Sequence, residues 1–524
     1  MIKDPLNIPL EQRLIGPLLT WRAETEKDRT FIEVDQRSWS FAEVNFEVQA
    51  LARGLKDLGL NTQDSVALIL PNCIEMVLSW FSCSLLRAIN IPINPILVGE
   101  ILAKPFKDSK SRFLIIHEEF TTQLATLHKD ILNNLEQVII VGNFEKDSLP
   151  VGPKNYISFE SLLIREGKRI IIEADYRDIQ TVFYTSGTTG PAKGVQTLNA
   201  HQFSAACGFA KAVALNKNDI LFTAYPLFHG LAARLGVLPC LLVGAKVVID
   251  RKLSTKNFWQ KVVDCKATVA HSIFSTPRLL LDQPINAHEK LHCLRAMFNS
   301  HYSKEFEDRF NVKLIEGFSM TETGFILYTK WPERKEGSSG KAHEDWEVIL
   351  VDEFDKPVQI GLVGEMVARP KIPYIMMQGY LNQPQATVEA FRNLWFHTGD
   401  LMRQDKDGYF FYIDRTKERI RKRGENISSF DIEQIVSSHP EIEECVALPL
   451  QKENDDEIRL LVVKRIKTDL TEVLLYEWLQ NKLPKYMLPT YIEFFTELPH
   501  TPTNKVEKVK LIKQGLSDQA WRQA

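Results

Sequence analysis

The sequence predicts an α/β protein, in which a large N-terminal domain of mainly parallel sheets and layered helices is followed by a small α+β domain. Three observations lead to this prediction. The chain has 524 residues, more than one compact core usually contains. Strand-like apolar runs alternate with helix-like segments over roughly the first 400 residues, as in layered α/β sheets. The pattern then changes, and the roughly 110 residues that remain suit one small domain.

In the first part, strands are predicted from short runs of Val, Ile, Leu and Phe. Residues 66–70 form one such run, and residues 75–86 follow with apolar side chains at helical spacing. A strand at residues 181–184 and a helix at about residues 199–215 flank a glycine-rich loop. Further strands are predicted at residues 113–116, 138–141, 246–250 and 313–316. This alternation favours parallel strands connected by helices.

The second part begins after residues 408–415, at a boundary marked by charged residues more than by Gly or Pro. We therefore place one domain at residues 1–414 and another at residues 415–524. The smaller domain is predicted to contain a basic turn, a helix from about Ser429, strands near Val446 and Leu460, and a second helix near Leu475.

Composition excludes several classes of protein. The net charge is −3, so electrostatics favour neither nucleic acid nor an anionic membrane as partner. No apolar run reaches the length of a transmembrane segment, and the N-terminus lacks the apolar core of a signal peptide. The seven cysteines are scattered without metal-type spacing, which is typical of reduced thiols. A cytoplasmic protein with no transmembrane segment is expected. The sequence does not decide whether it forms a homo-oligomer.

The glycine-rich loop at residues 184–195 suits a polyphosphate. Within residues 185–194 it has four hydroxyl side chains, three glycines and one lysine. Glycines let backbone N–H groups point inward, and the hydroxyls and the lysine add donors. It is not a Walker A loop, because Ala192 and Gly194 stand where glycine and a hydroxyl are required. The alternative, a flexible polar linker, rarely has this density of Thr, Gly and Lys.

The loop resembles the signature of the acyl-adenylate-forming, or AMP-binding, superfamily, which includes acyl-CoA synthetases. Pro191 comes one place early and Ala192 precedes the lysine, but the glycine and lysine spacing is kept. The resemblance extends over nearly the whole chain. It implies ATP, Mg²⁺ and coenzyme A as ligands, and a small C-terminal domain that is mobile. From the loop it assigns to ATP the residues Thr185, Ser186, Gly187, Thr188, Thr189, Gly190 and Lys193.

A second matching segment follows the strand predicted at residues 313–316. The resemblance assigns to ATP the residues Glu316, Gly317, Phe318, Ser319, Met320 and Thr321. Phe318 would stack on adenine, Thr321 would donate to the α-phosphate, and Glu322 would bind Mg²⁺. Ser319 replaces the family's usual glycine. Core packing and a solvated charge are the alternative for this segment taken alone.

The third matching segment, residues 395–400, ends at Asp400, whose carboxylate would accept hydrogen bonds from both ribose hydroxyls. In the family the residue matching Arg415 contacts the ribose, and the residue matching Lys417 is the hinge of the mobile domain. The basic run at residues 421–426 is either a solvated loop or a site for the phosphates of coenzyme A. The second interpretation assigns CoA binding to Arg423, Gly424 and Glu425.

The last matching segment, residues 498–508, has the Pro-x-Thr-x-Thr-x-Lys spacing that places Lys505 where the family has its catalytic lysine. The resemblance implies catalytic roles for Lys505, Thr321 and His229. Two positions depart from the pattern: residues 299–303 replace a Ser-Gly-Gly-Ala type segment, and Arg87 stands where glycine is common.

The expected function is that of an AMP-forming acid–CoA ligase. His229 stands where amino-acid-activating relatives have an acid that binds the substrate amine, which favours a carboxylate without an α-amino group. Residues 382–387 and 423–428 are most similar to carnitine/crotonobetaine-type CoA ligases, whereas Phe228 and Leu231 favour a fatty or other apolar acyl group. Two alternatives remain: a ligase that loads a carrier protein acting in trans, and a non-catalytic nucleotide-binding protein.

Overall fold

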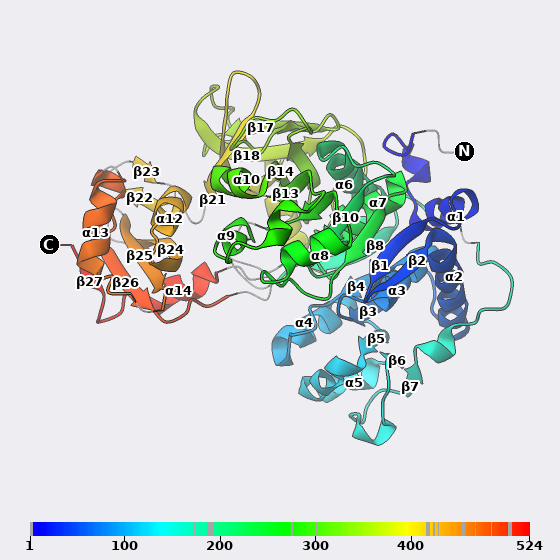
Figure 1. Cartoon of the computed structure of the whole chain (residues 1–524). Coiled ribbons are helices and arrows are strands. Elements are labelled where there is room, and N and C mark those ends of the chain that lie inside the picture. Colours follow the sequence, from blue (N-terminus) through cyan, green and yellow to red (C-terminus); the bar gives the residue numbers. More distant parts are fainter. Residues whose placement is uncertain are drawn as a thin grey trace. The chain divides into compact units, whose positions relative to one another are not determined.

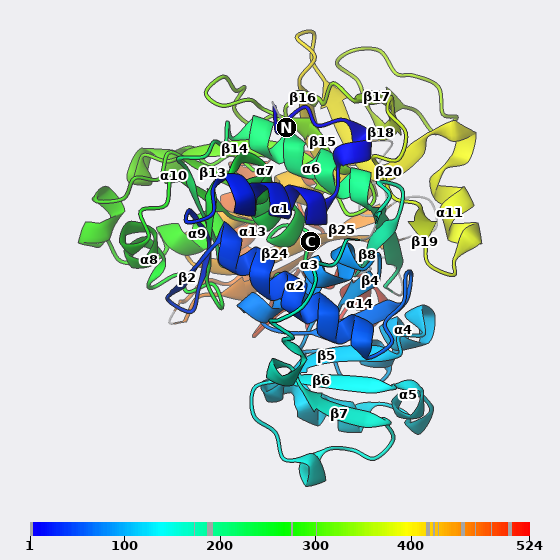
Figure 2. The ribbon, with the colours of Figure 1, turned by 90° about the vertical axis from the view of Figure 1, so that its right-hand side faces the viewer.

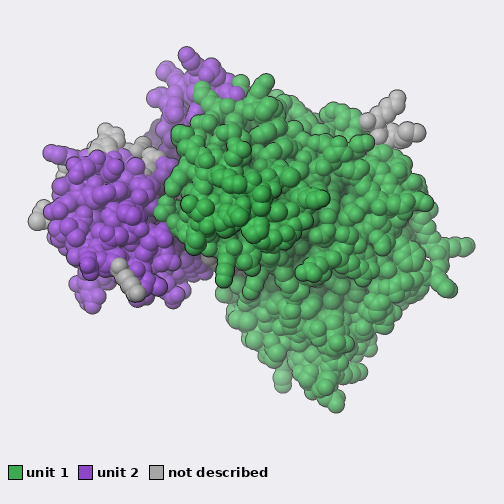
Figure 3. All heavy atoms as spheres, viewed as in Figure 1, with its two compact units in different colours: residues 1–185, 193–347, 369–389 green, residues 186–192, 348–368, 390–524 purple. Residues whose placement is uncertain are grey.

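The computed structural model describes the chain except for residues 1–3, 172, 186–191, 274–275, 300, 416–419, 423–424, 428, 452–455, 467, 484, 501–505 and 524; the side chains of residues 421, 422, 425, 426, 431 and 486 are also outside the description. Two compact units can be distinguished (Figure 3). Unit 1 comprises Met1–Thr185, Lys193–Glu347 and Arg369–Glu389. Unit 2 consists chiefly of Val348–Ala368 and Ala390–Ala524.

Unit 1 contains two large sheets with helices packed against them (Figure 1). The order of strands in the first sheet is β16-β15-β14-β13-β12-β10-β11-β1-β2. Its central pairs, from β14 to β1, are parallel, whereas β2, β15 and β16 are added antiparallel. The bounds are β1 Thr30–Val34, β2 Arg37–Ser40, β10 Ile220–Thr223, β11 Lys246–Ile249, β12 Val269–His271, β13 Ala296–Asn299, β14 Lys313–Met320, β15 Gly324–Tyr328 and β16 Lys341–Ala342.

The second sheet has the order β19-β9-β8-β4-β3-β5-β6-β7. Its strands from β8 to β7 pair in parallel, and β9 and β19 are added antiparallel beyond β8. The bounds are β3 Ser65–Ile69, β4 Ile89–Pro92, β5 Phe113–His117, β6 Gln137–Val141, β7 Asn155–Ser158, β8 Ile179–Tyr184, β9 Gly194–Leu198 and β19 Gly379–Tyr380. The strands β3, β5 and β6 are buried on both faces, which explains their nearly continuous apolar sequences.

The helices of unit 1 cover these sheets; α1, α2 and α3 lie together in Figure 2. A capping box begins α2, in which the Ser40 hydroxyl accepts from the Glu43 N–H and the Glu43 carboxylate accepts from the Ser40 N–H. The bounds are α1 Ile15–Thr25, α2 Phe41–Asp57, α3 Ile74–Leu85, α4 Gly99–Ser109, α5 Lys129–Asn134, α6 Asn199–Ala212, α7 Leu238–Val243, α8 Phe258–Asp264, α9 Thr276–Leu281, α10 Lys304–Phe310 and α11 Pro384–Ala390, with a π-helical turn, η5, at Ala233–Val237.

Unit 2 contains a four-stranded sheet, a β-ribbon and a second sheet with helices. The first sheet is β17 Trp346–Val351, β18 Val363–Pro370, β20 Phe396–Gln404 and β21 Phe410–Arg415; the ribbon is β22 Ile420–Lys422 and β23 Glu425–Ile427. The second sheet is β24 Ile442–Gln451, β25 Asp456–Lys464, β26 Tyr491–Phe495 and β27 Trp521–Arg522, and the helices are α12 Ser429–Ser437, α13 Glu472–Gln480 and α14 Lys508–Gln514. The expected α+β character of the C-terminal part is present, and the boundary at residue 414 stays a prediction.

The predicted strands and helices are confirmed, whereas several other elements, β9 among them, were not predicted. The strand β9 lies between the glycine-rich loop and the helix α6, where the sequence indicated no strand. Arg87, which replaces a common glycine, has a φ of +58°, the left-handed region that glycine tolerates best. Its guanidinium donates to both carboxylate oxygens of Asp178, at 2.7 and 2.9 Å. None of the helices in the described residues has the length and apolar content of a membrane span.

Candidate active site

The glycine-rich loop connects two antiparallel strands, β8 and β9. Tyr184 pairs with Gly194 at the ends of these strands, and the Thr185 N–H donates to the Lys193 carbonyl oxygen at 3.1 Å. The ends of the loop are therefore held together. Lys193 and Thr185 belong to the described residues, whereas the candidate ATP residues Ser186, Gly187, Thr188, Thr189 and Gly190 lie outside them.

The second matching segment forms the hairpin of β14 and β15, with Thr321, Glu322 and Thr323 in its turn. A Cβ at Gly317 would lie 2.7 Å from Cζ of Phe325, so close packing requires glycine there. Phe318 is partly exposed, as a ring that stacks on adenine must be. The pairing shifts by one residue between Phe318 and Ser319. Ser319 does not have a positive φ, so its side chain strains no backbone there.

The Glu316 side chain accepts a hydrogen bond from the backbone of a neighbouring loop. Its Oε2 accepts from the Gly337 N–H at 2.9 Å, and it is only 4% exposed. Burial raises the pKa of this carboxyl to about 8, against the opposing effects of the Gly337 hydrogen bond and of Arg334. The carboxyl is thus mostly protonated at neutral pH, and its assignment to ATP stays a prediction.

Glu322 is held by the segment that leads to β19. The Tyr380 hydroxyl donates to Oε1 of Glu322 at 3.1 Å, and the Met377 N–H donates to the Glu322 carbonyl oxygen at 2.8 Å. Glu322 and Tyr380 are both 8% exposed. Burial and the neighbouring Glu322 carboxylate raise the pKa of the Tyr380 hydroxyl, so that it remains a donor.

A buried arginine side chain holds the backbone of the same turn. Arg234, in the π-helical turn η5, donates from Nη2 to the Met320 carbonyl oxygen at 2.9 Å and from Nη1 to that of Thr321 at 3.1 Å. Burial lowers the pKa of Arg234 to about 10, and the charge of Glu322 opposes the shift. The guanidinium therefore stays protonated at neutral pH. π-Helical turns are frequent at functional sites.

Tyr380 connects the glycine-rich loop with the turn of Glu322. It pairs with Val195 in β9, directly after the loop, and the Lys193 ammonium lies 4.6 Å from the centroid of its ring. Sequence reasoning missed Tyr380. It stands two residues before the matching segment 382–387, but a lone tyrosine carries no chemical signal of its own.

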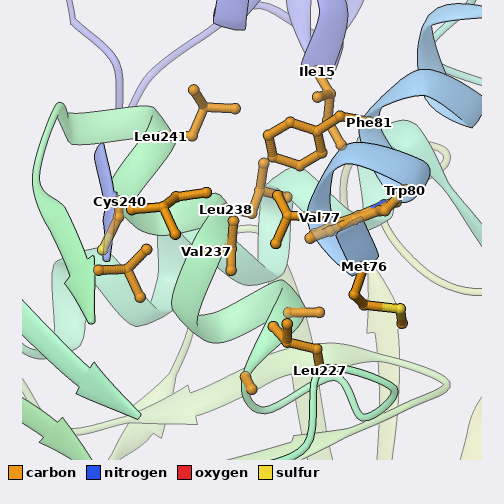
Figure 4. Packing of buried hydrophobic residues seen from close by; sticks show 14 of the residues in the cluster. Ile15, Met76, Val77, Trp80, Phe81, Leu227, Val237, Leu238, Cys240 and Leu241 are labelled. Atoms are coloured by element: carbon orange, nitrogen blue, oxygen red, sulfur yellow. The ribbon is translucent and has the colours of Figure 1, made fainter. Parts of the chain in front are cut away.

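His229 is exposed, and it lies on a turn whose preceding backbone is held by a buried side chain. Its Nδ1 accepts from the Leu231 N–H at 3.2 Å. The buried Asn72 donates to the Tyr225 carbonyl oxygen at 2.9 Å and accepts from the Leu227 N–H at 2.8 Å. Figure 4 shows Leu227 and the neighbouring η5 and α7 packed near Val77 and Trp80 of α3. The catalytic role of His229 stays a prediction.

Residues 299–303, which depart from the family's pattern, follow the strand β13. Asn299 is buried, and its Nδ2 donates to the His301 carbonyl oxygen at 2.7 Å. Burial lowers the pKa of His301 to about 4, so its ring is neutral at neutral pH. Asn299 thus shapes the chain here with a side-chain hydrogen bond where the family's segment uses glycines.

In unit 2, Asp400 and Arg415 face each other across the strands β20 and β21. They are register partners, and Nε of Arg415 donates to Oδ1 of Asp400 at 3.2 Å. Asp400 is 2% exposed, and its N–H donates to the Thr398 hydroxyl at 3.1 Å. The structure therefore brings together the two residues that the sequence assigned to the ribose.

The remaining candidates lie outside the described residues. These are the hinge residue Lys417, the CoA-binding residues Arg423 and Gly424, and the catalytic residue Lys505. Glu425 is described by its backbone only, in β23, which pairs with β22. Four residues of the basic run, which was expected as a turn, thus belong to two antiparallel strands.

Comparison with known proteins gives a consistent result. The model of the family "AMP-binding enzyme" matches residues 19–381, and that of the "AMP-binding enzyme C-terminal domain" matches residues 431–505. The crotonobetaine/carnitine–CoA ligase of Salmonella typhimurium is 30% identical over 488 residues, covering 91% of this chain and 93% of the ligase. The same ligase of Salmonella typhi matches equally.

Solved structures share the fold. The anthranilate CoA ligase AuaEII, in complex with anthranoyl-AMP, superposes with a TM-score of 0.87 at 23% identity and 98% coverage of both chains. The O-succinylbenzoate CoA synthetase of Bacillus subtilis, in complex with ATP and magnesium ion, gives a TM-score of 0.79 at 22% identity, with 94% and 98% coverage. The fold class and the family resemblance are confirmed, and the chain belongs to the AMP-binding enzyme family.

Proposed function

We propose that the protein is an AMP-forming acid–CoA ligase, an acyl-CoA synthetase that uses ATP, Mg²⁺ and coenzyme A. One observation carries the proposal: Lys193 and Glu322, from segments far apart in the sequence, both contact Tyr380. A lysine beside a buried carboxylate suits a nucleotide phosphate and its cation. The paired Asp400 and Arg415 of unit 2 support the proposal, since they match the family's ribose contacts.

In the first half-reaction, a carboxylate oxygen of the acid bonds to the α-phosphorus of ATP. The bond from that phosphorus to the bridging oxygen breaks, and pyrophosphate leaves. The nucleophile is already an anion, so no general base is required. Lys193, Thr321 and Lys505 would stabilise the charge that gathers at the phosphates.

Mg²⁺ fits the donor set at Glu322. Its Oε1 accepts from Tyr380, and among the described residues its Oε2 has no hydrogen-bond partner. The described residues contain no cluster of three or more side chains able to hold a metal by themselves. One carboxylate combined with substrate phosphates is a usual arrangement for Mg²⁺. When bound, the cation neutralises charge on the phosphates.

In the second half-reaction, the sulfur of coenzyme A loses its proton and bonds to the acyl carbon, and the bond to AMP breaks. We assign the binding of the CoA phosphates to Arg423, Gly424 and Glu425. A rotation about a hinge at Lys417, at the boundary between residues 1–414 and 415–524, would bring these residues to the adenylate.

The unpaired state of all seven cysteines supports a reducing, cytoplasmic location.

The donor is proposed to be an acyl carboxylate without an α-amino group. Support comes from His229, which offers no carboxylate to a substrate amine, and from the ligases of crotonobetaine and carnitine among the relatives. Fatty acids and carnitine-like acids are both within this class.

The test is pyrophosphate exchange and AMP release with a panel of short, medium and long acids, carnitine, crotonobetaine and amino acids. Each acid is assayed with CoA, with a holo carrier protein and with neither. AMP release that requires CoA and a simple acid is expected. Preference for the carrier would overturn the acceptor, and preference for an amino acid would overturn the donor. ATP binding without pyrophosphate exchange for any acid would favour a non-catalytic nucleotide-binding protein. Gel filtration measures whether the protein forms a homo-oligomer.

A further inference from the structure

The turn that carries Thr321 and Glu322 is fixed from several sides. Arg234 holds the carbonyl oxygens of Met320 and Thr321, and the Met377 N–H holds that of Glu322. These contacts hold the backbone of the turn and do not involve the Glu322 carboxylate. Only one described contact orients the carboxylate itself, and it is the hydrogen bond from Tyr380.

Tyr380 is itself held with little freedom. Its backbone pairs with Val195 in β9, and its N–H donates to the Thr387 hydroxyl at 3.0 Å. The Thr387 hydroxyl in turn donates to the Gln383 carbonyl oxygen at 3.0 Å. The ring is 8% exposed, and the Lys193 ammonium lies near its face. The hydroxyl is thus held on β19, which pairs with β9, the strand that follows the glycine-rich loop.

We infer that Tyr380 is a positioning residue, whose hydroxyl holds Oε1 of Glu322 so that Oε2 is presented to the divalent cation of the nucleotide. The inference rests on the proposed function. Hydrogen bonds to a ligating carboxylate fix its orientation, and their loss typically lowers metal affinity by about 10- to 100-fold. Tyr380 also contacts both the loop lysine and the carboxylate.

The test measures binding, without turnover. The affinity for Mn²⁺ is determined from the electron paramagnetic resonance signal of the free ion, in the presence of α,β-methylene-ATP. Tyr380→Phe removes only the hydroxyl and keeps the ring beside Lys193. We expect the Kd for Mn²⁺ to rise about 10- to 100-fold, whereas the Kd for the analogue without metal stays within about twofold of the wild type.

Tyr328→Phe is the matched control. Tyr328 is also buried, and its hydroxyl donates to Oε2 of Glu344 at 2.8 Å, outside the proposed site. This variant should lose comparable stability on heating but bind Mn²⁺ like the wild type. Glu322→Gln should weaken Mn²⁺ binding, and adding Tyr380→Phe to it should weaken binding little further, because both changes act on one carboxylate.

Three results would overturn the inference: unchanged Mn²⁺ affinity in Tyr380→Phe, an equal loss in Tyr328→Phe, or additive losses in the double variant. If Tyr380→Phe does not fold, Thr387→Val replaces it, and a smaller loss in the same direction is expected; no loss would overturn the inference. Pyrophosphate exchange by the wild type decides the proposed function separately. A wild type that exchanges pyrophosphate while Tyr380→Phe keeps its Mn²⁺ affinity leaves the function standing and removes the role of Tyr380.

Discussion

Single side chains at the candidate site show how a protein keeps charge in a buried place. Arg234 is 3% exposed, and burial lowers its pKa to about 10 against the charge of Glu322, so the guanidinium that holds two carbonyl oxygens remains protonated at neutral pH. Glu316, which has no cation in hydrogen-bond contact, is instead held mostly neutral. Burial thus leaves the Arg234 guanidinium charged and the Glu316 carboxyl mostly neutral at neutral pH.

The first prediction concerns Lys505. Lys505→Ala should lower the rate of adenylate formation by about 10²- to 10³-fold or more, because one charge contact of the transition state is lost. ATP binding and thermal unfolding should change little. Lys510→Ala, which changes an exposed lysine of α14, is the control and should react like the wild type. Unimpaired pyrophosphate exchange in Lys505→Ala would exclude the catalytic role.

A second prediction follows from Glu316. Its pKa is about 8 in the folded state and near 4.5 in the unfolded chain, so between these values the folded state binds more protons. The free energy of unfolding should therefore fall as pH rises from about 5 to 8, by on the order of 3 kcal/mol. In Glu316→Gln, which is neutral throughout, this fall should be absent from urea unfolding curves measured at several pH values. An equally steep fall in the variant would show that other groups cause it.

At the scale of elements, the apolar runs predicted β3, β5, β6, β8, β11 and β14 of the two large sheets, because buried strands consist largely of apolar side chains. The strand β9 was missed, since Gly194–Leu198 is short and half polar and depends on pairing with β8 and β19. Tyr380 was missed for the same reason: its role depends on contacts with residues distant in the sequence. The resemblance assigned Asp400 and Arg415 to the ribose, which stays a prediction, and the register of β20 and β21 places the two residues opposite each other.

The hairpin of β14 and β15 yields a third prediction. Gly317→Ala should destabilise the protein by roughly 1–3 kcal/mol, because the added methyl group would overlap the Phe325 ring. Gly16→Ala in α1 is the control, since its Cβ would lie 3.1 Å from the end of the Leu85 side chain and 4.0 Å from the Leu85 backbone, and alanine favours helix. Thermal unfolding of both variants gives the comparison, and equal midpoints would contradict the close packing at Gly317.

At the scale of the whole molecule, β21 and α12 are joined across the segment that contains the predicted hinge. The Asp414 carboxylate accepts from the Ser429 N–H at 2.6 Å, at the start of α12. A carboxylate at a helix N-terminus is stabilised by the free N–H groups there. If the C-terminal domain rotates about Lys417, this contact must be made in one orientation and broken in the other. The rotation therefore exchanges one set of specific contacts for another and needs a backbone free to change its angles.

The last prediction tests this freedom. Lys417→Pro fixes φ near −65° at the hinge, so the domain should keep one orientation. One half-reaction should then continue and the other should slow strongly, which separate assays of pyrophosphate exchange and of thioester formation from added acyl-adenylate would measure. Lys406→Pro is the control. It changes the second residue of the tight turn between β20 and β21, a position where proline fits, so both half-reactions should proceed as in the wild type. Full rates for both half-reactions in Lys417→Pro would mean that the chain rotates about another residue, because a locked hinge cannot serve two orientations.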